Sequence, residues 1–444
     1  MVLPSKNNRF LGVAANVCRL LLALVFLLSG FLKAADPVGA AVKLQEYAEL
    51  FSFDTLSGGV MQFGAMLLAS FEFLLGVFLF TGAYRRLVSF LSVVVMLVFV
   101  PLSFYVWFNG SMDDCGCFGN SIAVSPRDTF FKNVVLLLLA VIVYAGRGRF
   151  VPKVSSRCRW MVTLFSLAYI ITLNGFSYFH LPVVDFGHFA VGKDVRELTT
   201  PVPGRYELQS VYVKDSVEIV LPCDSVPGDG WDFVETRSLL VEPGVPAVIA
   251  EFSIIDWDYD REHSDEILSD TGYVCLVSIE RVESASVARV DKINDLYDHC
   301  VANGVPFYAV SASSEDDIRL WGKRTGAEYP VYWADAALLR SMVRSNPGLL
   351  LFKDGVVVGK WNVADIPDIE LLEVSSTGMP DGVRASLAKM QMWQPWAALF
   401  GVVLFFILLL DVVLSGIARR RLVRAAEAEK LAGGNRPAIN ENEL

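Results

Sequence analysis

Six long apolar runs constrain the fold of this chain more than any other feature. A helix of about 20 apolar residues spans the roughly 30 Å hydrocarbon core of a bilayer. The runs occupy residues 10–33, 60–81, 87–108, 130–144, 160–179 and 393–417, the fourth being the shortest. Hydrophobic residues make up 54% of the chain but gather in its first 180 residues and in the last run. The sequence therefore predicts an α-helical membrane bundle with a separately folded part between the fifth and sixth spans.

A cleaved signal peptide is the alternative interpretation of the first run, because Lys6 and Arg9 give it a basic start. The run is long for such a peptide, Arg19 and Lys33 lie within it or at its end, and no small-residue cleavage site follows cleanly. We therefore expect the first run to remain as a membrane span.

Lysine and arginine collect in every second connection between the runs. The basic segments are residues 6–9, 85–86, 147–159 and 419–424. Short basic loops are retained in the cytoplasm, so a single topology fits all four segments. We expect a multi-pass protein of a bacterial inner membrane, with the lipid bilayer as partner and both termini in the cytoplasm. Residues 181–392 would then be periplasmic, and residues 418–444 would form a cytoplasmic tail.

Cys115 and Cys117 are the only closely spaced pair among seven cysteines, and they lie in an outer connection of this topology. A Cys-Gly-Cys disulfide closes a small, strained ring, and a strained, exposed disulfide exchanges more readily than a structural one. Two alternatives remain open, since each cysteine can pair elsewhere or both can be inert. No metal site is predicted, because two further ligands at recognised spacing are missing and the four histidines are scattered.

Charged residues within the apolar runs are candidates for function, because ionisable groups at membrane depth are costly. Glu72 lies near the middle of the second run. It can pair with Arg19 as a structural clasp inside the bundle, or it can take part in proton transfer beside a membrane quinone. Arg19 and Glu72 are accordingly the candidates for cofactor binding. We expect Lys33 to extend its side chain to the outer interface.

The first 180 residues resemble the DoxX-like membrane proteins and, within them, the methylamine utilisation family MauE. The resemblance lies in Arg19, Ser29-Gly30-Phe31-Leu32-Lys33, Asp36-Pro37, Phe71-Glu72-Phe73-Leu74-Leu75-Gly76 and Asp114-Cys115-Gly116-Cys117-Phe118-Gly119. It implies a four-helix membrane domain over residues 1–150 with two outward cysteines, to which residues 151–180 add a fifth helix. It also implies disulfide handling during maturation of a periplasmic amine dehydrogenase.

The region between the fifth and sixth spans has two parts. Residues 181–255 are predicted to be a β-rich connection with a hairpin at 206–213 and 217–221 and another strand at 248–256. Residues 256–392 alternate strands with helices and end in a hairpin, which predicts an α/β sandwich. The strands are expected at 273–279, 306–311, 349–353 and 356–361, and the helices at 286–302, 316–325 and 336–344.

This order resembles a thioredoxin-like domain of the TlpA type, in which a proline before the final hairpin is usually cis. The resemblance makes Pro347 the cis-proline and the candidate client-binding residue. Active proteins of this type carry Cys-x-x-Cys after the first core strand, but residues 280–286 contain no cysteine. We interpret Cys275 and Cys300 as small buried hydrophobic residues. The domain is therefore predicted to be a redox-dead thioredoxin fold, and the whole arrangement resembles DoxX-type proteins of the Bacteroidota.

Three functional classes follow. In the first, Cys115 and Cys117 form the catalytic pair of a thiol–disulfide oxidoreductase acting on a periplasmic protein client. In the second, the chain is a non-catalytic membrane scaffold that presents the thioredoxin-like domain. The third, a transporter or channel subunit, is disfavoured because the spans contain few polar residues. The net charge of −10 and the lack of a basic stripe in the outer region exclude nucleic acid as a partner.

Overall fold

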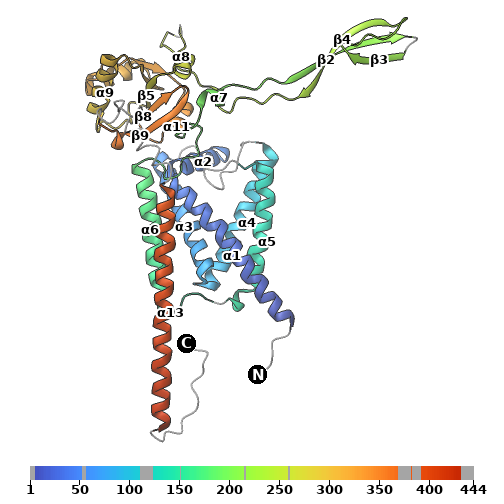
Figure 1. Ribbon diagram of the computed structural model, residues 1–444. Helices are drawn as coiled ribbons and strands as arrows, with labels where there is room; N and C mark the ends of the chain where they lie inside the picture. Colours follow the sequence, from blue (N-terminus) through green and yellow to red (C-terminus); the bar gives the residue numbers. More distant parts are fainter. Residues whose placement is uncertain are drawn as a thin grey trace. The chain divides into compact units, whose positions relative to one another are not determined.

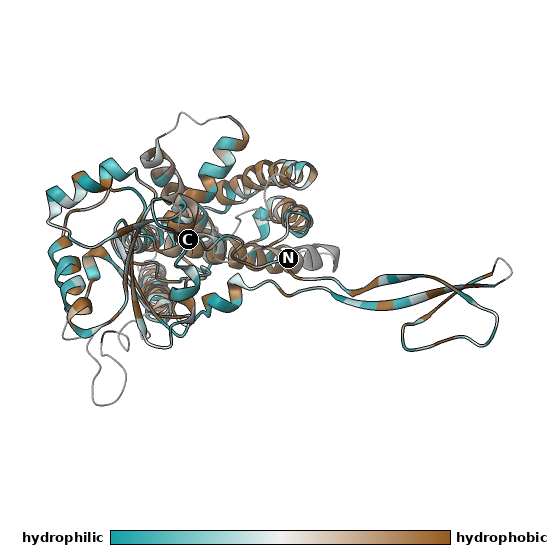
Figure 2. Cartoon of the chain, turned by 90° about the horizontal axis from the view of Figure 1, so that it is seen from above, coloured by the Kyte–Doolittle hydropathy of each residue, from teal (hydrophilic) through white to brown (hydrophobic). Residues whose placement is uncertain are grey.

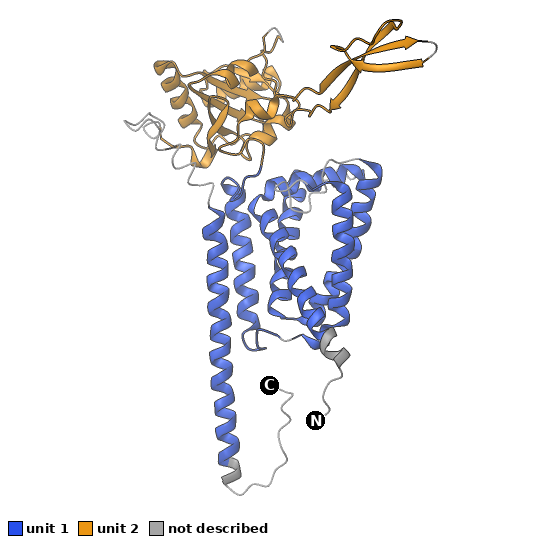
Figure 3. Cartoon of the chain, turned by 45° about the vertical axis from the view of Figure 1, so that its right-hand side comes forward, with its two compact units in different colours: residues 1–186, 388–444 blue, residues 187–387 orange. Residues whose placement is uncertain are grey.

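The computed structural model describes residues 6–52, 57–110, 124–150, 152–214, 217–258, 261–368, 382 and 392–431. The chain divides into two compact units (Figure 3). Unit 1 contains residues 1–186 and 388–444, and unit 2 contains residues 187–387. The predicted fold class, a helical membrane bundle with a mixed α/β domain, is confirmed.

Unit 1 is helical. Its helices are α1 (Lys6–Ala35), α2 (Pro37–Leu50), α3 (Gly58–Thr81), α4 (Arg85–Asn109), α5 (Pro126–Ala145), α6 (Arg159–Phe179) and α13 (Trp393–Leu431), with a short 3-10 turn η1 (Arg147–Arg149). Within the described residues, all but α2 and η1 are long and apolar enough to cross a membrane, so the six predicted spans are confirmed. Figure 2, which views the bundle from above, shows these helices as mainly apolar.

The helix ends differ from the predicted ends for local reasons. The fourth span begins at Pro126 rather than residue 130, because the Ser125 hydroxyl accepts a hydrogen bond from the Asp128 amide at 3.1 Å and proline suits the first helical turn. The Asp36 carboxylate caps α2 by accepting from the Gly39 amide at 2.8 Å. Helix α13 continues past the predicted end at residue 417 to Leu431.

Helices α1 and α3 pack closely because each contributes a glycine to the contact (Figure 1). A Cβ atom added at Gly30 of α1 would lie 2.4 Å from the Phe73 nitrogen of α3. A Cβ atom added at Gly76 of α3 would lie 2.6 Å from the Leu27 nitrogen of α1. Real side chains do not tolerate such distances, so only glycine permits this approach at either position.

Helix α13 packs on α6 through aromatic and polar contacts. The Tyr169 hydroxyl donates to the Trp396 carbonyl at 2.9 Å, and the rings of Phe165 and Phe400 stack with centroids 5.5 Å apart. Toward the other end of α13, the buried Asp411 carboxylate accepts from the Ser155 amide at 2.9 Å and from the Ser155 hydroxyl. The last span is therefore joined to the segment that precedes α6 as well as to α6 itself.

The core of unit 2 is a five-stranded sheet of order β7-β6-β5-β8-β9. Its strands are β5 (Tyr273–Ile279), β6 (Phe307–Ser311), β7 (Val331–Trp333), β8 (Gly348–Lys353) and β9 (Val356–Asn362). Strands β5, β6 and β7 run parallel, whereas β8 pairs antiparallel with β5 and β9. Helices α9 (Val290–Asn303) and α10 (Glu315–Thr325) contribute Ile293, Leu296 and Trp321 to the core that they form with β5 and β8. This arrangement is compatible with the predicted thioredoxin-like domain.

Most predicted elements of this domain are present, with two differences. Helix α9 begins at Val290 rather than residue 286, because the Ser286 amide donates to the Asn346 carbonyl at 2.9 Å instead of joining a helix. Strand β7 was not predicted, since three residues after Pro330 are too few to show a period. The remaining short elements of unit 2 are α7 (Val195–Thr199), α8 (Ser264–Ser269), α11 (Ala336–Met342) and η2 (Val363–Asp365).

A second sheet of unit 2 has the order β3-β2-β4. The predicted hairpin forms β2 (Arg205–Lys214) and β3 (Val217–Pro222), and β4 (Asp232–Glu242) pairs with β2 on the other side. Every residue of β4 is exposed, so this strand has no buried face. The strand predicted at 248–256 is wrong, because Ile255 makes only isolated bridges to Glu262 and Trp333.

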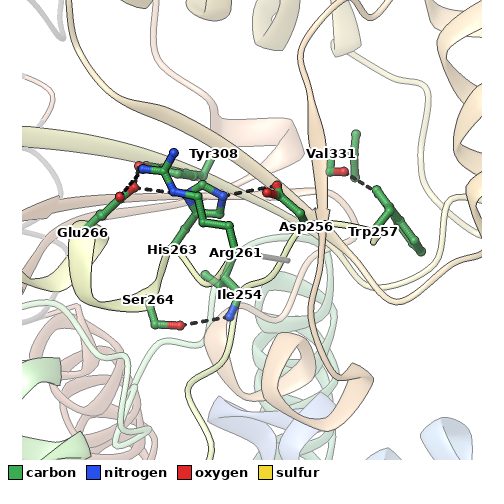
Figure 4. A network of polar contacts seen from close by, with 9 residues as sticks. All are labelled: Ile254, Asp256, Trp257, Arg261, His263, Ser264, Glu266, Tyr308 and Val331. Atoms are coloured by element: carbon green, nitrogen blue, oxygen red, sulfur yellow. Dashed lines mark hydrogen bonds and ion pairs between the residues drawn. The ribbon is translucent and has the colours of Figure 1, made fainter. Parts of the chain in front are cut away.

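His263 holds the segment before α8 against the β7 edge of the core sheet. Figure 4 shows its ring between two carboxylates, with Nε2 3.2 Å from Asp256 Oδ1 and Nδ1 3.0 Å from Glu266 Oε2. Arg261 also contacts the Glu266 carboxylate. Trp257 Nε1 donates to the Val331 carbonyl at 2.6 Å, which fixes the segment to β7. Hydrogen bonds from Arg261 and His263 lower the pKa of Glu266.

We expect Gly76→Ala to lower the stability of the bundle by about 1–3 kcal/mol, since the added methyl group overpacks the α1–α3 contact. Thermal unfolding of the detergent-purified protein measures the change. Gly175→Ala is the matched control, because a Cβ atom at this glycine of α6 meets nothing within 4 Å. Equal unfolding temperatures for the two variants would contradict the close packing.

We expect Glu266→Gln to remove part of the acid sensitivity of unit 2. A carboxyl group whose pKa is lower in the folded state stabilises the fold above its unfolded pKa, and this stabilisation is lost as the pH falls through the folded value. The difference in unfolding temperature between wild type and variant should therefore shrink as the pH falls below the ordinary glutamate value of 4.5. Glu251→Gln, at an exposed glutamate, serves as control. A constant difference at all pH values would rule out this role of Glu266.

Candidate functional site

The loop with Cys115 and Cys117 lies outside the described residues, but the helix ends on both sides of it are defined. Helix α4 ends at Asn109, followed by Gly110 with a left-handed φ of 58°, and α5 begins at Pro126. Residues 111–123 therefore connect two helix ends at the end of unit 1 where α1 and α6 also end (Figure 1). We call this the loop end of unit 1.

A buried ionic cluster joins α1 to α3 toward the loop end. The Lys33 ammonium lies 2.7 Å from Glu72 Oε2 and 2.8 Å from the Ser29 hydroxyl oxygen. The Ser29 hydroxyl donates to the same Glu72 oxygen at 2.7 Å. Glu72 is 0% exposed and Lys33 is 6% exposed. Because Ser29 and Lys33 are four residues apart on one helix, one face of α1 presents both donors to the carboxylate.

Two expectations about this cluster are corrected. Lys33 was expected to reach the outer interface, but its ammonium is buried against Glu72, since a buried carboxylate requires a compensating charge. Arg19 was the expected partner of Glu72 in a structural clasp, but Lys33 takes that place. Arg19 and Lys33 are about 21 Å apart along α1 at a rise of about 1.5 Å per residue. A single carboxylate cannot pair with both.

Arg19 lies in the opposite half of the bundle. It is 3% exposed, and its guanidinium carbon lies 5.2 Å from the centre of the Phe150 ring. Its Nε and Nη1 atoms have no hydrogen-bond acceptor in the described part of the chain. Arg85 and Phe78 line the same small recess. The structure therefore separates the two residues that the sequence proposed for one cofactor site.

Further polar groups occupy the interior of unit 1 toward the loop end. Asn133 Nδ2 of α5 donates to the Ser103 hydroxyl of α4 at 3.2 Å. Asn174 Nδ2 of α6 donates to the Ser70 hydroxyl of α3 at 3.3 Å. Buried oxygen atoms without a hydrogen-bond partner in the described structure include Glu72 Oε1, Thr129 Oγ1, Asn174 Oδ1 and Ser177 Oγ. This half of the bundle can thus accept hydrogen bonds or protons from a bound group.

Pro347 follows a cis peptide bond, as the thioredoxin-like resemblance predicted. Residues 280–286, which lack the dithiol, are hydrogen-bonded to the loop that contains Pro347. Asn346 Nδ2 donates to the Arg281 carbonyl at 2.8 Å and to the Ser284 hydroxyl at 3.2 Å. Asn346 Oδ1 is buried without a partner in the described structure. Residues 280–286 contain no cysteine, so this loop supplies no thiol beside Pro347.

The cysteines described in unit 2 lie elsewhere. Cys275 in β5 and Cys300 in α9 are both buried, as predicted, and Cys223 is exposed in the stretch after β3. Among the described residues, no group of three or more histidine, cysteine, aspartate or glutamate side chains is placed to hold a metal ion.

Two polar contacts of the bundle were not predicted from the sequence. One is Lys33 as the partner of Glu72, for which the spacing of Ser29 and Lys33 was the available signal. The other is Asp411, an acid within the sixth apolar run that binds Ser155. Both cases follow from the same rule, since a carboxylate at membrane depth requires a donor from another helix or loop.

Comparison with known proteins agrees with the membrane part of this description. Residues 11–146 match the family of the methylamine utilisation protein MauE. Protein TlpB of Flavobacterium psychrophilum is 24% identical over 212 residues, which cover 47% of this chain and 55% of that protein. The chain thus matches about half the length of this curated relative. No solved structure matches the chain. The predicted resemblance is confirmed, and residues 11–146 of this multi-pass membrane protein are similar to the MauE family.

Proposed function

We propose that this chain is a membrane-bound thiol–disulfide exchange protein, with Cys115 and Cys117 as the exchanging pair and a periplasmic protein as client. The observation that carries the proposal is the buried Lys33–Glu72 pair, which lies toward the loop end in the region similar to the MauE family. The basic connections support a location in a bacterial inner membrane, with both termini cytoplasmic and residues 181–392 periplasmic.

The proposed reaction is a disulfide exchange in two steps. A client thiolate attacks one sulfur of the Cys115–Cys117 disulfide, which breaks that bond, forms a mixed disulfide and releases the other cysteine as a thiolate that takes up a proton. A second client thiolate then attacks the client sulfur of the mixed disulfide and releases the remaining cysteine. The client loses two electrons and gains a disulfide, and Cys115 and Cys117 gain the electrons and two protons. The same path in reverse reduces a client.

In this proposal Lys33 is a positioning residue for the thiols. Glu72 and Ser29 hold its ammonium group at the end of α1 that lies at the loop end. The Glu72 carboxylate offsets this positive charge at a distance, so the ammonium group favours the thiolate form only of a cysteine in direct contact with it. Glu72 Oε1 is buried without a hydrogen-bond partner among the described residues.

A membrane quinone remains a proposal for the electron acceptor. A quinone accepts two electrons and two protons, and its carbonyl oxygens require hydrogen-bond donors. The unpartnered N–H groups of Arg19 fit that requirement, whereas an ionised Glu72 carboxylate only accepts. Arg19 lies in the opposite half of the bundle from the loop with Cys115 and Cys117, so a quinone bound to Arg19 would not contact that pair directly.

A non-catalytic scaffold is the second candidate function, and the composition of residues 280–286 favours it for unit 2. This loop carries no cysteine and is bonded to the loop with the cis-proline. We propose that unit 2 binds or positions the client near Pro347. Exchange chemistry at Cys115 and Cys117 would add to this binding role. Without that chemistry, the protein would act only as a scaffold.

Cysteine variants test the exchange. We expect Cys115→Ser or Cys117→Ser to accumulate a reductant-sensitive adduct with a disulfide-bonded client protein. The remaining thiolate attacks the client disulfide and releases one client thiolate, and the second cysteine that would displace the other client sulfur is missing. Non-reducing electrophoresis of membranes and mass spectrometry of the adduct measure this. The double variant and Cys223→Ser, at an exposed cysteine of unit 2, are the controls. An unchanged partner list in both single variants would support the scaffold instead.

The Lys33–Glu72 pair is tested by removing both charges, because loss of one partner alone leaves a buried charge and costs about 3–5 kcal/mol. We expect the double variant Lys33→Met, Glu72→Gln to shift the alkylation of Cys115 and Cys117 to higher pH. Peptide-resolved mass spectrometry after timed labelling gives the pH profile. Lys43→Met, which removes a lysine paired with Glu46 at 3.0 Å on α2, is the control. An unshifted profile would remove Lys33 from the mechanism.

A further inference from the structure

Two thiols meet in the core of unit 2. The sulfur atoms of Cys275 and Cys300 lie 3.6 Å apart. Their residues are 4% and 2% exposed, respectively. Both belong to the apolar core that β5 and β8 form with α9 and α10. The two thiols are therefore in direct contact with each other.

The pair connects the strand and helix that flank the loop without cysteines. Cys275 is near the start of β5, and Cys300 is in the last turn of α9. Residues 280–286 follow the end of β5 and precede the start of α9. The two thiols therefore lie at the far end of this strand–helix pair from the position at which a thioredoxin-like dithiol would be expected.

We propose that Cys275 and Cys300 form a structural disulfide that joins β5 to α9 in the mature protein. A disulfide has a sulfur–sulfur distance of about 2.05 Å, so the two atoms need to approach by about 1.5 Å. The linked residues are 25 positions apart, and a cross-link over such a loop restricts the unfolded chain.

Burial distinguishes this disulfide from an exchanging one. A bond enclosed by the core of unit 2 is shielded from thiolates in solution, whereas Cys-Gly-Cys in a polar loop is open to them. The proposal concerns unit 2 alone and does not depend on exchange at Cys115 and Cys117. Its formation in cells requires the oxidising compartment proposed for residues 181–392.

Oxidation by a small disulfide such as oxidised glutathione, before the core of unit 2 encloses the two thiols, accounts for all atoms and electrons. Either cysteine can be the first nucleophile, and the steps are written for Cys300. Its thiolate breaks the glutathione disulfide, forms a mixed disulfide and releases one glutathione. Cys275, after losing its proton, attacks the Cys300 sulfur and releases the second glutathione. The protein loses two electrons, and two glutathione thiols receive the electrons and protons.

The test uses the full chain in detergent with Cys115→Ser and Cys117→Ser, which removes the proposed exchanging pair. The protein is purified from cells without reductant, denatured in an excess of alkylating agent and digested. We expect a linked peptide pair containing Cys275 and Cys300 that disappears on prior reduction. Cys18 and Cys158, described as thiols in unit 1, report that the alkylation is complete. Alkylated Cys275 and Cys300 in the protein purified without reductant would overturn the proposal.

Thermal unfolding gives a second measurement on the same protein. We expect reductant to lower the unfolding temperature of unit 2 and to have no such effect on the variant Cys275→Val, Cys300→Ala. If reductant does not change the unfolding temperature of the protein that retains Cys275 and Cys300, the structural disulfide is contradicted. If the variant does not fold, the linked peptide decides the question. Since Cys115 and Cys117 are absent from the tested protein, a negative result leaves the proposed exchange untouched.

Discussion

The buried pair of Lys33 and Glu72 is the constraint on which the membrane unit depends. An ionised carboxylate inside a helical bundle is tolerated only if a partner neutralises it, and Lys33 meets this need together with the Ser29 hydroxyl. The requirement fixes the relative position of α1 and α3 along their axes. Gly30 and Gly76 then permit the close approach that brings the groups within hydrogen-bond distance. Charge and packing therefore specify the same register.

The distribution of polar groups gives the bundle two unlike halves. Toward the loop end, α3, α4, α5 and α6 contribute hydroxyl and amide groups, several of which lack partners in the described structure. In the other half, the Arg19 guanidinium lies against Phe150, and the Asp411 carboxylate accepts from the Ser155 amide. Both halves of the bundle thus contain buried polar groups, and the Lys33–Glu72 pair belongs to the half where residues 111–123 connect α4 to α5.

The sequence predicted elements well where the signal is local and poorly where it depends on another part of the chain. Long apolar runs identified the six spans, and short apolar runs with a turn dipeptide identified β5, β8 and β9, because both patterns are read within one segment. Strand β4 was missed because all its residues are exposed, and β7 because three residues show no period. The partner of Glu72 was wrongly assigned to Arg19, since an apolar run records that a charge is buried but not which helix supplies its counter-ion.

The packing of α6 against α13 has a consequence for the evolution of the chain. The end of α6 and the start of α13 are adjacent, with the rings of Phe176 and Trp396 5.4 Å apart. Unit 2 therefore leaves and re-enters the bundle at neighbouring points, which is the topology of a domain insertion. Such a module can be exchanged for another of different fold while the helices keep their contacts. A lineage could in this way acquire new recognition specificity without rebuilding its membrane anchor.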